Sequence, residues 1–240
     1  MSAPLSQQLA ASWIDSRVRA AHPDYVAVLV AASGLTPGRT TEHTEAMLRE
    51  AEVRVGALLG KRGVDDLPEV TAWRQAYRDF GVRPREARSS VEALLRRAAR
   101  GLPRIDRLTD VYNAVSVLHL VPVGGEDVAG YQGAARLVVA TGDEQFDTVD
   151  NGQVTIHSAA PGEIIWRDDV GVTCRRWNWR QCVRTRLTAT TTEALFIIDG
   201  LGPQARDRAE AAATDLVDRL AAGSPDAIFE ARSLADEPID

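Results

Sequence analysis

Residues 161–182, PGEIIWRDDVGVTCRRWNWRQC, lie where the chain changes from helical to strand-like character. Two strand-like runs, Glu163–Arg167 and Val170–Trp177, are separated by an Asp-Asp pair that is typical of a turn. The last nine residues hold two Trp, three Arg, one Asn and one Gln between two Cys. On a strand, successive side chains face opposite sides, so Trp177 and Trp179 are expected on one side and Asn178 on the other.

More strand-like runs surround this stretch, and turn residues separate them. The segment 123–130, VGGEDVAG, resembles turn material. We expect a further short strand and an acidic tail within residues 223–240. The remaining predicted strands are Ala135–Ala140, Gln153–His157, Val183–Thr188 and Ala194–Ile198.

The N-terminal half is mostly helical in pattern. A buried strand is predicted at Tyr25–Leu35, and amphipathic helices are predicted at 42–59, 68–80, 90–99 and 105–118. Pro203 begins a final helix, with Ala209, Ala212, Leu216 and Leu220 along one side. Because helices come first, strands follow and a helix ends the series, the pattern indicates an α+β fold.

Composition limits the classes of protein that fit. The chain has 240 residues, 45% of them hydrophobic, with a net charge of −6 and a pI near 5.3. No apolar run approaches the roughly 20 residues of a membrane helix, and the first residues lack the pattern of a signal peptide. Two Cys do not make a disulfide framework. We therefore expect a cytoplasmic protein with no membrane partner.

Arginine is distributed unevenly. Between Arg83 and Arg107 the sequence has eight Arg and three acidic residues. Between Arg175 and Arg186 it has five Arg and no acidic residue. Such clusters fit either contacts with an anionic partner or ordinary solvated faces, because charge counts alone do not define a binding patch.

Common catalytic motifs are absent from the sequence. The four His are scattered and lie at no metal-ligand spacing from the Cys, and neither a phosphate-binding loop nor a nucleophile elbow is present. We expect no metal and no cofactor. Cys174 and Cys182 lack a neighbouring base that would activate a thiol.

Polar residues in apolar surroundings are the candidates for binding. A buried Arg needs a carboxylate partner, so Glu163 or Asp168 is expected to pair with Arg175 or Arg176. Fixed donors on this segment suit an acidic or nucleotide-like group, while the Trp rings fit either a ligand-stacking role or the core. Asp110 and Asn113 are expected on one face of a helix. They fit either a ligand-binding site or a helix that is capped and held in place by polar groups. The donors are Arg176, Asn178, Arg180 and Gln181.

Taken in order, several segments resemble stand-alone relatives of the B3/B4 domain, the tRNA-editing domain of the phenylalanyl-tRNA synthetase beta subunit. The resemblance runs from about Trp73 to Leu220. It implies a helical N-terminal part, then a curved mixed or antiparallel sheet around a pocket with a C-terminal helix, a PheT/TilS-like fold. The segments are 73–97, 102–116, 122–130, 161–169 and 174–182.

The resemblance also divides the chain and points to residues. It predicts that residues 1–70 form an N-terminal extension packed on the core. Residues 71–222 are expected to form the B3/B4-like domain, and residues 223–240 a strand with an acidic tail. The pattern Pro-x-His-x-Phe-Asp matches residues 122–127, with Gly124 at the His position and Asp127 kept. The editing Glu matches Glu193.

Three functions follow as expectations. The first is trans-editing, the hydrolysis of mischarged aminoacyl-tRNA, with the tRNA acceptor end as partner. The second is a non-catalytic module that binds an amino acid or small metabolite, and the third is an aminoacyl-tRNA-dependent transferase. Glu193 and Asn178 are the predicted catalytic residues. The predicted ligand-binding residues are Arg175, Arg176, Trp177, Trp179, Arg180, Asp127, Asn113, Glu163 and Asp168.

Overall fold

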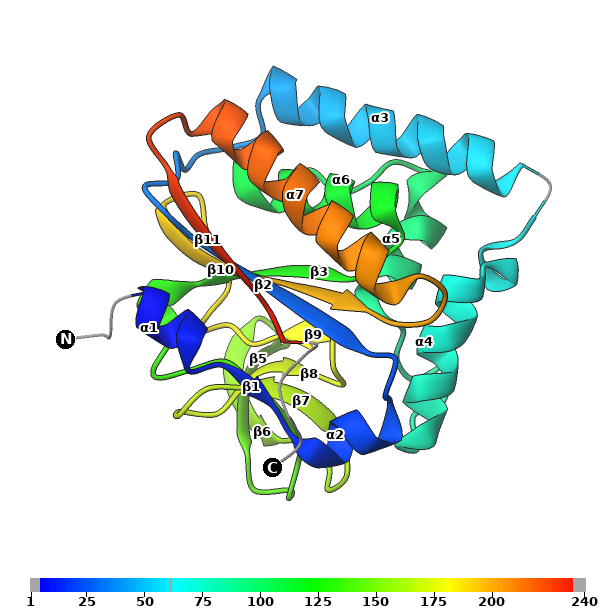
Figure 1. The fold of residues 1–240 in the computed structure, drawn as a ribbon, viewed down its shortest axis with the longest axis vertical. Helices are drawn as coiled ribbons and strands as arrows, with labels where there is room; N and C mark the ends of the chain where they lie inside the picture. The colour runs from blue at the N-terminus through cyan, green and yellow to red at the C-terminus, as the bar shows by residue number, and fades with distance from the viewer. Residues whose placement is uncertain (1–4, 61, 235–240) are drawn as a thin grey trace.

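A four-stranded antiparallel sheet forms the centre of the computed structural model, which describes residues 5–60 and 62–234 (Figure 1). The strand order is β11-β2-β10-β3. The long strands β2 and β10 are buried along almost their whole length, because both faces of this sheet are covered. The strands are β2 (Val26–Ser33), β3 (Val123–Asp127), β10 (Glu193–Gly200) and β11 (Ile228–Ser233).

Three helices cover one face of this sheet. α6 (Arg107–His119) and α7 (Ala205–Gly223) contact the strands, and α3 (Glu42–Leu59) lies over α6 (Figure 1). The Thr41 hydroxyl accepts a hydrogen bond from the Thr44 amide at the start of α3, and Asp106 accepts one from Thr109 at the start of α6. These caps fix where two of the covering helices begin.

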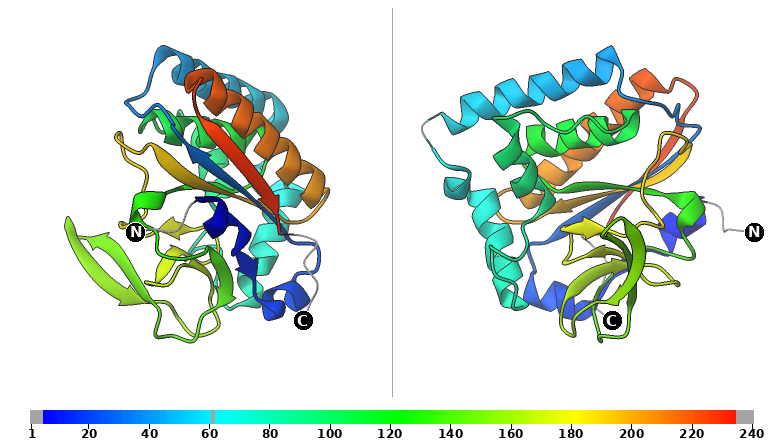
Figure 2. Two further views of the ribbon diagram at one scale, coloured as in Figure 1. Left: turned by 60° about the vertical axis from the view of Figure 1, so that its left-hand side comes forward. Right: turned by 180° about the vertical axis from the view of Figure 1, so that it is seen from behind.

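A second, five-stranded sheet lies on the opposite face, and the β5–β6 hairpin projects from it (Figure 2). The strand order is β1-β4-β7-β8-β9. Its strands are β1 (Trp13–Ile14), β4 (Arg136–Val139), β7 (Ile164–Arg167), β8 (Val172–Arg175) and β9 (Arg180–Gln181), and the hairpin comprises β5 (Gln145–Asp150) and β6 (Gln153–Ser158). Shorter elements flank the sheets: α1 (Leu5–Ala10), α2 (Ser16–Ala21), η1 (Val64–Asp66), α4 (Pro68–Asp79), α5 (Ser90–Ala98) and η2 (Val128–Gly130).

The architecture confirms the α+β prediction and most predicted elements. α3, α4, α5, α6 and α7 begin and end within a few residues of their predicted bounds. β2, β4, β6, β7, β10 and β11 are also found where strands were expected. Local patterning therefore located most of the elements that form the two layers.

Three local predictions were wrong. The strand expected at Val170–Trp177 ends at Arg175, and residues 176–179 form a turn that leads into β9. The run Val183–Thr188 is not a strand, and Arg186 contributes only an isolated bridge to Glu126. Conversely, the expected turn at 123–130 contains β3, followed by the short turn η2.

Close packing explains why glycines form part of β3. Gly125 lies opposite Phe196 of β10, and a Cβ atom at this position would lie 2.7 Å from Leu187 and 2.9 Å from Phe196. Gly in a strand often marks such close approach, so Gly125 reflects packing rather than a turn.

The described residues of segment 1–70 do more than pack on the core. β2 is an inner strand between β10 and β11, and β1 pairs in parallel with β4. The predicted acidic tail at 235–240 lies outside the described residues. Within the described ranges, none of the helices combines the length and apolar character needed to cross a bilayer.

Candidate functional site

A cavity of about 290 Å³ lies between the two sheets, beside α5 and α6. It is mostly apolar, with polar groups at a few positions. Two strands of the central sheet reach it: β3 contributes Val123, Gly124 and Glu126, and β10 contributes the alternate residues Ile197 and Asp199. Its other lining residues are Ser90, Ala93, Leu94, Pro103, Ile105, Tyr112, Asn113, Trp166, Cys174, Trp177, Asn178, Trp179, Arg180 and Gln181.

The turn at residues 176–179 carries three of these lining residues, and a buried carboxylate holds it. Glu163 accepts two hydrogen bonds from the guanidinium of Arg175, at 2.9 and 2.7 Å, and one from the Arg176 amide at 2.9 Å. Arg176 and Trp177 both have positive φ, 48° and 66°, which is an uncommon backbone conformation for these residues. Glu163 therefore stabilises an unusual turn and is not placed to bind a ligand.

Trp177 is a core residue at the wall of the cavity. It is fully buried, and its ring makes edge contacts with the rings of His22, Tyr25 and Trp73. These contacts reach elements from the first third of the chain. The aromatic cluster positions the neighbouring Asn178, whose amide enters the cavity.

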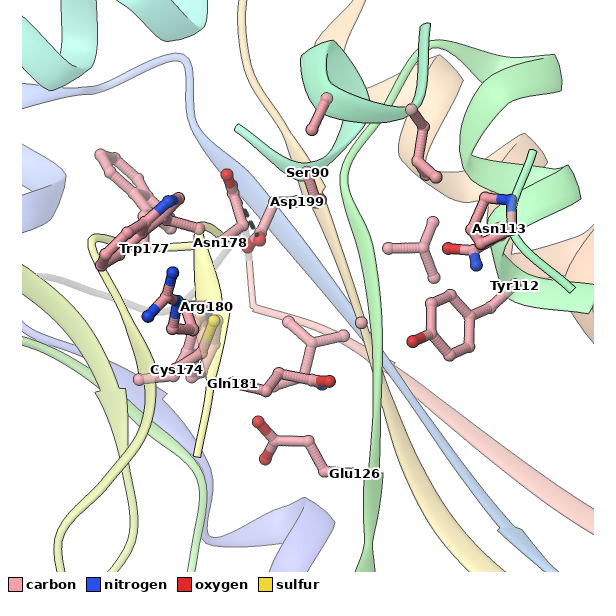
Figure 3. A pocket seen from close by; sticks show the side chains of 18 of the residues that line it. Ser90, Tyr112, Asn113, Glu126, Cys174, Trp177, Asn178, Arg180, Gln181 and Asp199 are labelled. Carbon is pink, nitrogen blue, oxygen red and sulfur yellow. Dashed lines mark hydrogen bonds between the residues drawn. The ribbon is translucent and has the colours of Figure 1, made fainter. Parts of the chain in front are cut away.

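Asn178 and Asp199 form a buried pair on one side of the cavity (Figure 3). The Asn178 amide Nδ2 donates to Asp199 Oδ2 over 3.2 Å, and the Tyr25 hydroxyl donates to Oδ1 over 2.5 Å. The Tyr77 hydroxyl donates to Asn178 Oδ1 over 2.9 Å. Burial raises the pKa of Asp199 to about 6, although the hydrogen bonds from Tyr25 and Asn178 oppose that rise.

A second buried acid, Glu126, lies at another end of the cavity. Figure 3 shows its carboxylate pointing toward the hairpin that carries Cys174 and Gln181. Burial raises its pKa to about 7, and the hydroxyls of Tyr131 and Thr173 lower it by less. Its Oε2 atom is buried and accepts no hydrogen bond from the described residues.

Arginine and tryptophan form the rim of the cavity. The guanidinium carbons of Arg176 and Arg180 lie 4.6 and 4.5 Å from the centre of the Trp179 ring. Arg180 is exposed and forms no ion pair with the described residues, whereas Arg176 also donates to the Glu86 carbonyl. This rim presents positive charge beside an aromatic surface, which suits an anionic or nucleotide-like group.

Five of the predicted site residues line this cavity: Asn113, Trp177, Asn178, Trp179 and Arg180. Arg175 and Glu163 pair with each other, as predicted, and do not line it. Of the two acids proposed as partners, Glu163 is therefore the one that pairs with Arg175, and Asp168 instead pairs with Arg184 through two hydrogen bonds of 2.7 and 2.9 Å. Arg176 contributes to the rim only.

Two predicted residues lie elsewhere. Glu193 is exposed at the start of β10, opposite Ser33, and does not line the cavity. The Asp127 side chain accepts hydrogen bonds from the Ala129 amide and the Thr191 hydroxyl, so it ties η2 to a loop. The predicted catalytic Glu193 is therefore remote from Asn178 along β10, where Asp199 is the carboxylate that contacts Asn178.

Sequence reasoning missed Glu126 and Asp199. Each had a visible signal, because Asp199 is a single acid after the apolar run 194–198 and Glu126 lies within a run read as a turn. Trp166 and Tyr112 were also not predicted to line the site, whereas Gln181, one of the predicted donors, does line it. Among the described residues, no three His, Cys, Asp or Glu side chains cluster in a way that could hold a metal ion.

Comparison with known families adds to this geometry. The model of the B3/4 domain family matches residues 72–231, two thirds of the chain. The chain belongs to this family. The match includes every residue that lines the cavity, from Ser90 to Asp199, but it begins within α4 and so leaves β2 outside it.

One solved structure is similar over most of the chain. It is an N-terminal fragment of the phenylalanyl-tRNA synthetase beta subunit from Pyrococcus horikoshii, 12% identical, with a TM-score of 0.46. The alignment covers 91% of this chain and 50% of that fragment, so the chain spans half of the length of the protein it matches. No curated protein matches the sequence.

Proposed function

We propose that this protein hydrolyses the ester of mischarged aminoacyl-tRNA, acting as a separate editing protein. The observation that carries the proposal is the Asn178–Asp199 pair, a donor and a carboxylate 3.2 Å apart on the wall of a largely apolar cavity. Membership of the B3/4 family and the earlier resemblance to a tRNA-editing domain support the choice of substrate.

The pair suits hydrolysis of an ester. Asp199, with a pKa of about 6, is mostly ionised at neutral pH yet still basic enough to take a proton from water. In this proposal water adds to the ester carbonyl as its proton passes to Asp199. Breaking the bond between the carbonyl carbon and the ribose oxygen then releases the amino acid, and the departing ribose oxygen takes that proton from Asp199 to become a hydroxyl.

Asn178 would stabilise the charge that develops on the carbonyl oxygen. Its amide nitrogen carries two protons, and only one is directed at Asp199, so the second remains for the substrate. The hydrogen bond from Tyr77 fixes the amide in this orientation. The role first given to Glu193 is therefore assigned here to Asp199.

The rim would hold the end of the tRNA. Trp179 offers a ring for stacking a base, and Arg180 offers a guanidinium for a phosphate. Four of the eight Arg between Arg83 and Arg107 pair with carboxylates, namely Arg83, Arg88, Arg96 and Arg104. Arg97 on α5 is exposed and forms no ion pair with the described residues, so it remains for RNA.

Deacylation tests the proposal directly. Phenylalanine tRNA charged with tyrosine or phenylalanine, followed by other aminoacyl-tRNAs, is mixed with catalytic amounts of protein, and loss of the ester is followed over time. Asn178→Ala and Asp199→Asn should each reduce the rate by about 100-fold, whereas Glu230→Gln, an exposed change on β11, should leave it unchanged. Loss at only the spontaneous rate across the panel would refute the hydrolase.

A non-catalytic binding module is the second candidate. Gly124 stands at the position where the resemblance expects His, and the free guanidinium of Arg180 can meet a carboxylate as well as a phosphate. This function predicts that free amino acids raise the melting temperature. Binding of tRNA would instead weaken steeply as salt increases, which separates the two candidates.

A further inference from the structure

Glu126 has no role in the ester chemistry, and its surroundings are unusual. Its side chain is 1% exposed, and one oxygen atom lies buried without a hydrogen bond from the described residues. An unpaired buried carboxylate oxygen costs free energy, so such a group marks either strain or a missing partner. The Glu126 side chain also lines the cavity, where a ligand can reach it.

The protein's own cations do not neutralise Glu126. Arg184 is the nearby cation, but it makes two hydrogen bonds to Asp168, whose charge offsets its effect on Glu126. Among the described residues that line the cavity, the single cation is Arg180, and it lies exposed at the rim. The buried part of the cavity therefore contains two acids and no compensating positive charge.

The position of Glu126 sets the length of the ligand. Glu126 pairs with Leu195 of β10, four residues before Asp199 on the same strand. At about 3.4 Å per residue, the two positions are separated by about 14 Å along the sheet. An α-amino group is bonded next to its ester carbonyl, so an ester at Asp199 places that amino group too far away to meet Glu126.

The strand residues between these two acids carry no charge. Ile197 lines the cavity there with Gly124 opposite, which has no side chain, and the Gln181 amide beside Gly124 already donates to the Gly125 carbonyl. A methylene chain can lie along such a wall while its charged end meets a partner. We propose that the cavity selects an aminoacyl ester whose long side chain ends in a cation, with Glu126 as its counter-charge.

This inference rests on the proposed ester site for its orientation, but it can be tested without any chemistry. L-lysinamide and L-norleucinamide share the α-ammonium and the side-chain stem and differ in the terminal ammonium, and neither carries an ester. Argininamide tests whether a guanidinium is also accepted. Calorimetric titration of each probe at pH 8 gives the affinity.

The wild-type protein should bind lysinamide about tenfold or more tightly than norleucinamide, as expected for a hydrogen bond between charged groups. Glu126→Gln should remove this preference and leave norleucinamide binding intact, while Glu230→Gln should bind both probes like the wild type. Equal affinities in the wild type, tighter norleucinamide binding, or a preference that survives in Glu126→Gln would each overturn the inference. The comparison of lysinamide and norleucinamide affinity uses the wild-type protein, so this test does not depend on whether a variant folds.

The pH dependence supplies a second readout. The groups that influence Glu126 or are influenced by it are Tyr131, Thr173, Cys174, Cys182, Asp168 and Arg184. Because Glu126 must be ionised to meet a cation, lysinamide affinity should rise about tenfold between pH 6 and pH 8 for a pKa near 7. Norleucinamide affinity should not show this rise, and an equal rise for both probes would contradict the assignment.

The outcomes separate this inference from the hydrolase. A lysinamide preference that depends on Glu126, without ester hydrolysis, would refute the hydrolase and support the inference. Hydrolysis that depends on Asn178, without a preference for lysinamide, would support the hydrolase and refute the inference about Glu126.

Discussion

The hydroxyl of Tyr77 on α4 donates to Oδ1 of Asn178 over 2.9 Å, across 101 residues of chain. With its oxygen held in this way, the Asn178 amide can direct Nδ2 only toward Asp199 and the cavity. A helix outside the sheets thus sets the orientation of a group at the centre of the site.

Tyr77→Phe removes the hydrogen bond that orients Asn178. We expect ester hydrolysis to fall about tenfold at every pH, because a poorly oriented amide loses part of its stabilisation of the transition state. The free energy of unfolding should fall by about 1 kcal/mol. Single-turnover deacylation and chemical denaturation measure the two effects, and unaltered hydrolysis would show that the Tyr77 hydroxyl does not orient the site.

Tyr25→Phe should change the pH dependence instead. The Tyr25 hydroxyl stabilises the ionised form of Asp199, so its removal raises the pKa of Asp199 above about 6. A higher pKa leaves less ionised base at a given pH, so the acid limb of kcat/KM should move to higher pH. Profiles from pH 5 to 8 should show that shift in Tyr25→Phe and a uniform reduction in Tyr77→Phe. Identical profiles would argue against Asp199 as the base.

Glu126→Gln should stabilise the protein at pH 8. The folded pKa of Glu126 is about 7, against 4.5 for an unperturbed Glu, so the folded state holds a proton more tightly than the unfolded chain. Stability from this group is fully present below pH 4.5 and is lost as pH rises through 7. The isosteric amide should therefore raise the free energy of unfolding by about 3 kcal/mol at pH 8 and by little near pH 4. Denaturation at both pH values tests this, and destabilisation at pH 8 would indicate a structural role.

Much of the outline could be predicted from the sequence, whereas the site could not. Caps, proline positions and apolar periodicity are local signals, and they located α3, α4 and β2 closely. The turn at 176–179 depends on Glu163, a contact distant from the turn itself, so strand periodicity extended β8 too far. Asp199 and Glu126 became candidates only when pairing between strands placed them at one cavity.

Glu163→Ala should test that turn. It leaves the guanidinium of Arg175 and the amide of Arg176 without their buried partner, which should cost about 3 kcal/mol of stability. Asp169→Ala breaks the Arg136–Asp169 pair, in which Asp169 is 60% exposed, and should cost less than about 1 kcal/mol. Thermal and urea denaturation compare the two variants. Equal costs would mean that the turn does not depend on Glu163.

Gly125→Ala and Gly124→Ala form another matched pair. A methyl group at 125 would overlap Leu187 and Phe196 in the core, so we expect a loss of about 2 kcal/mol. At position 124 the nearest atom is the amide nitrogen of the Gln181 side chain, 3.2 Å away, which can move. That variant should keep its stability but change ligand affinity. Comparable destabilisation of the two variants would contradict the conclusion that Gly125 is required by close packing against Leu187 and Phe196.

The position of β2 shows that the region matched by the family model is smaller than the unit that must fold together. The family match begins at residue 72, yet β2 is the strand that joins β10 to β11, and β11 pairs with no other described strand. A chain truncated to the matched region would leave β11 with no neighbour and expose a long edge of β10. Two pieces of the chain, residues 1–67 and 68–240, would each carry half of an interface, so they should regain structure only when mixed.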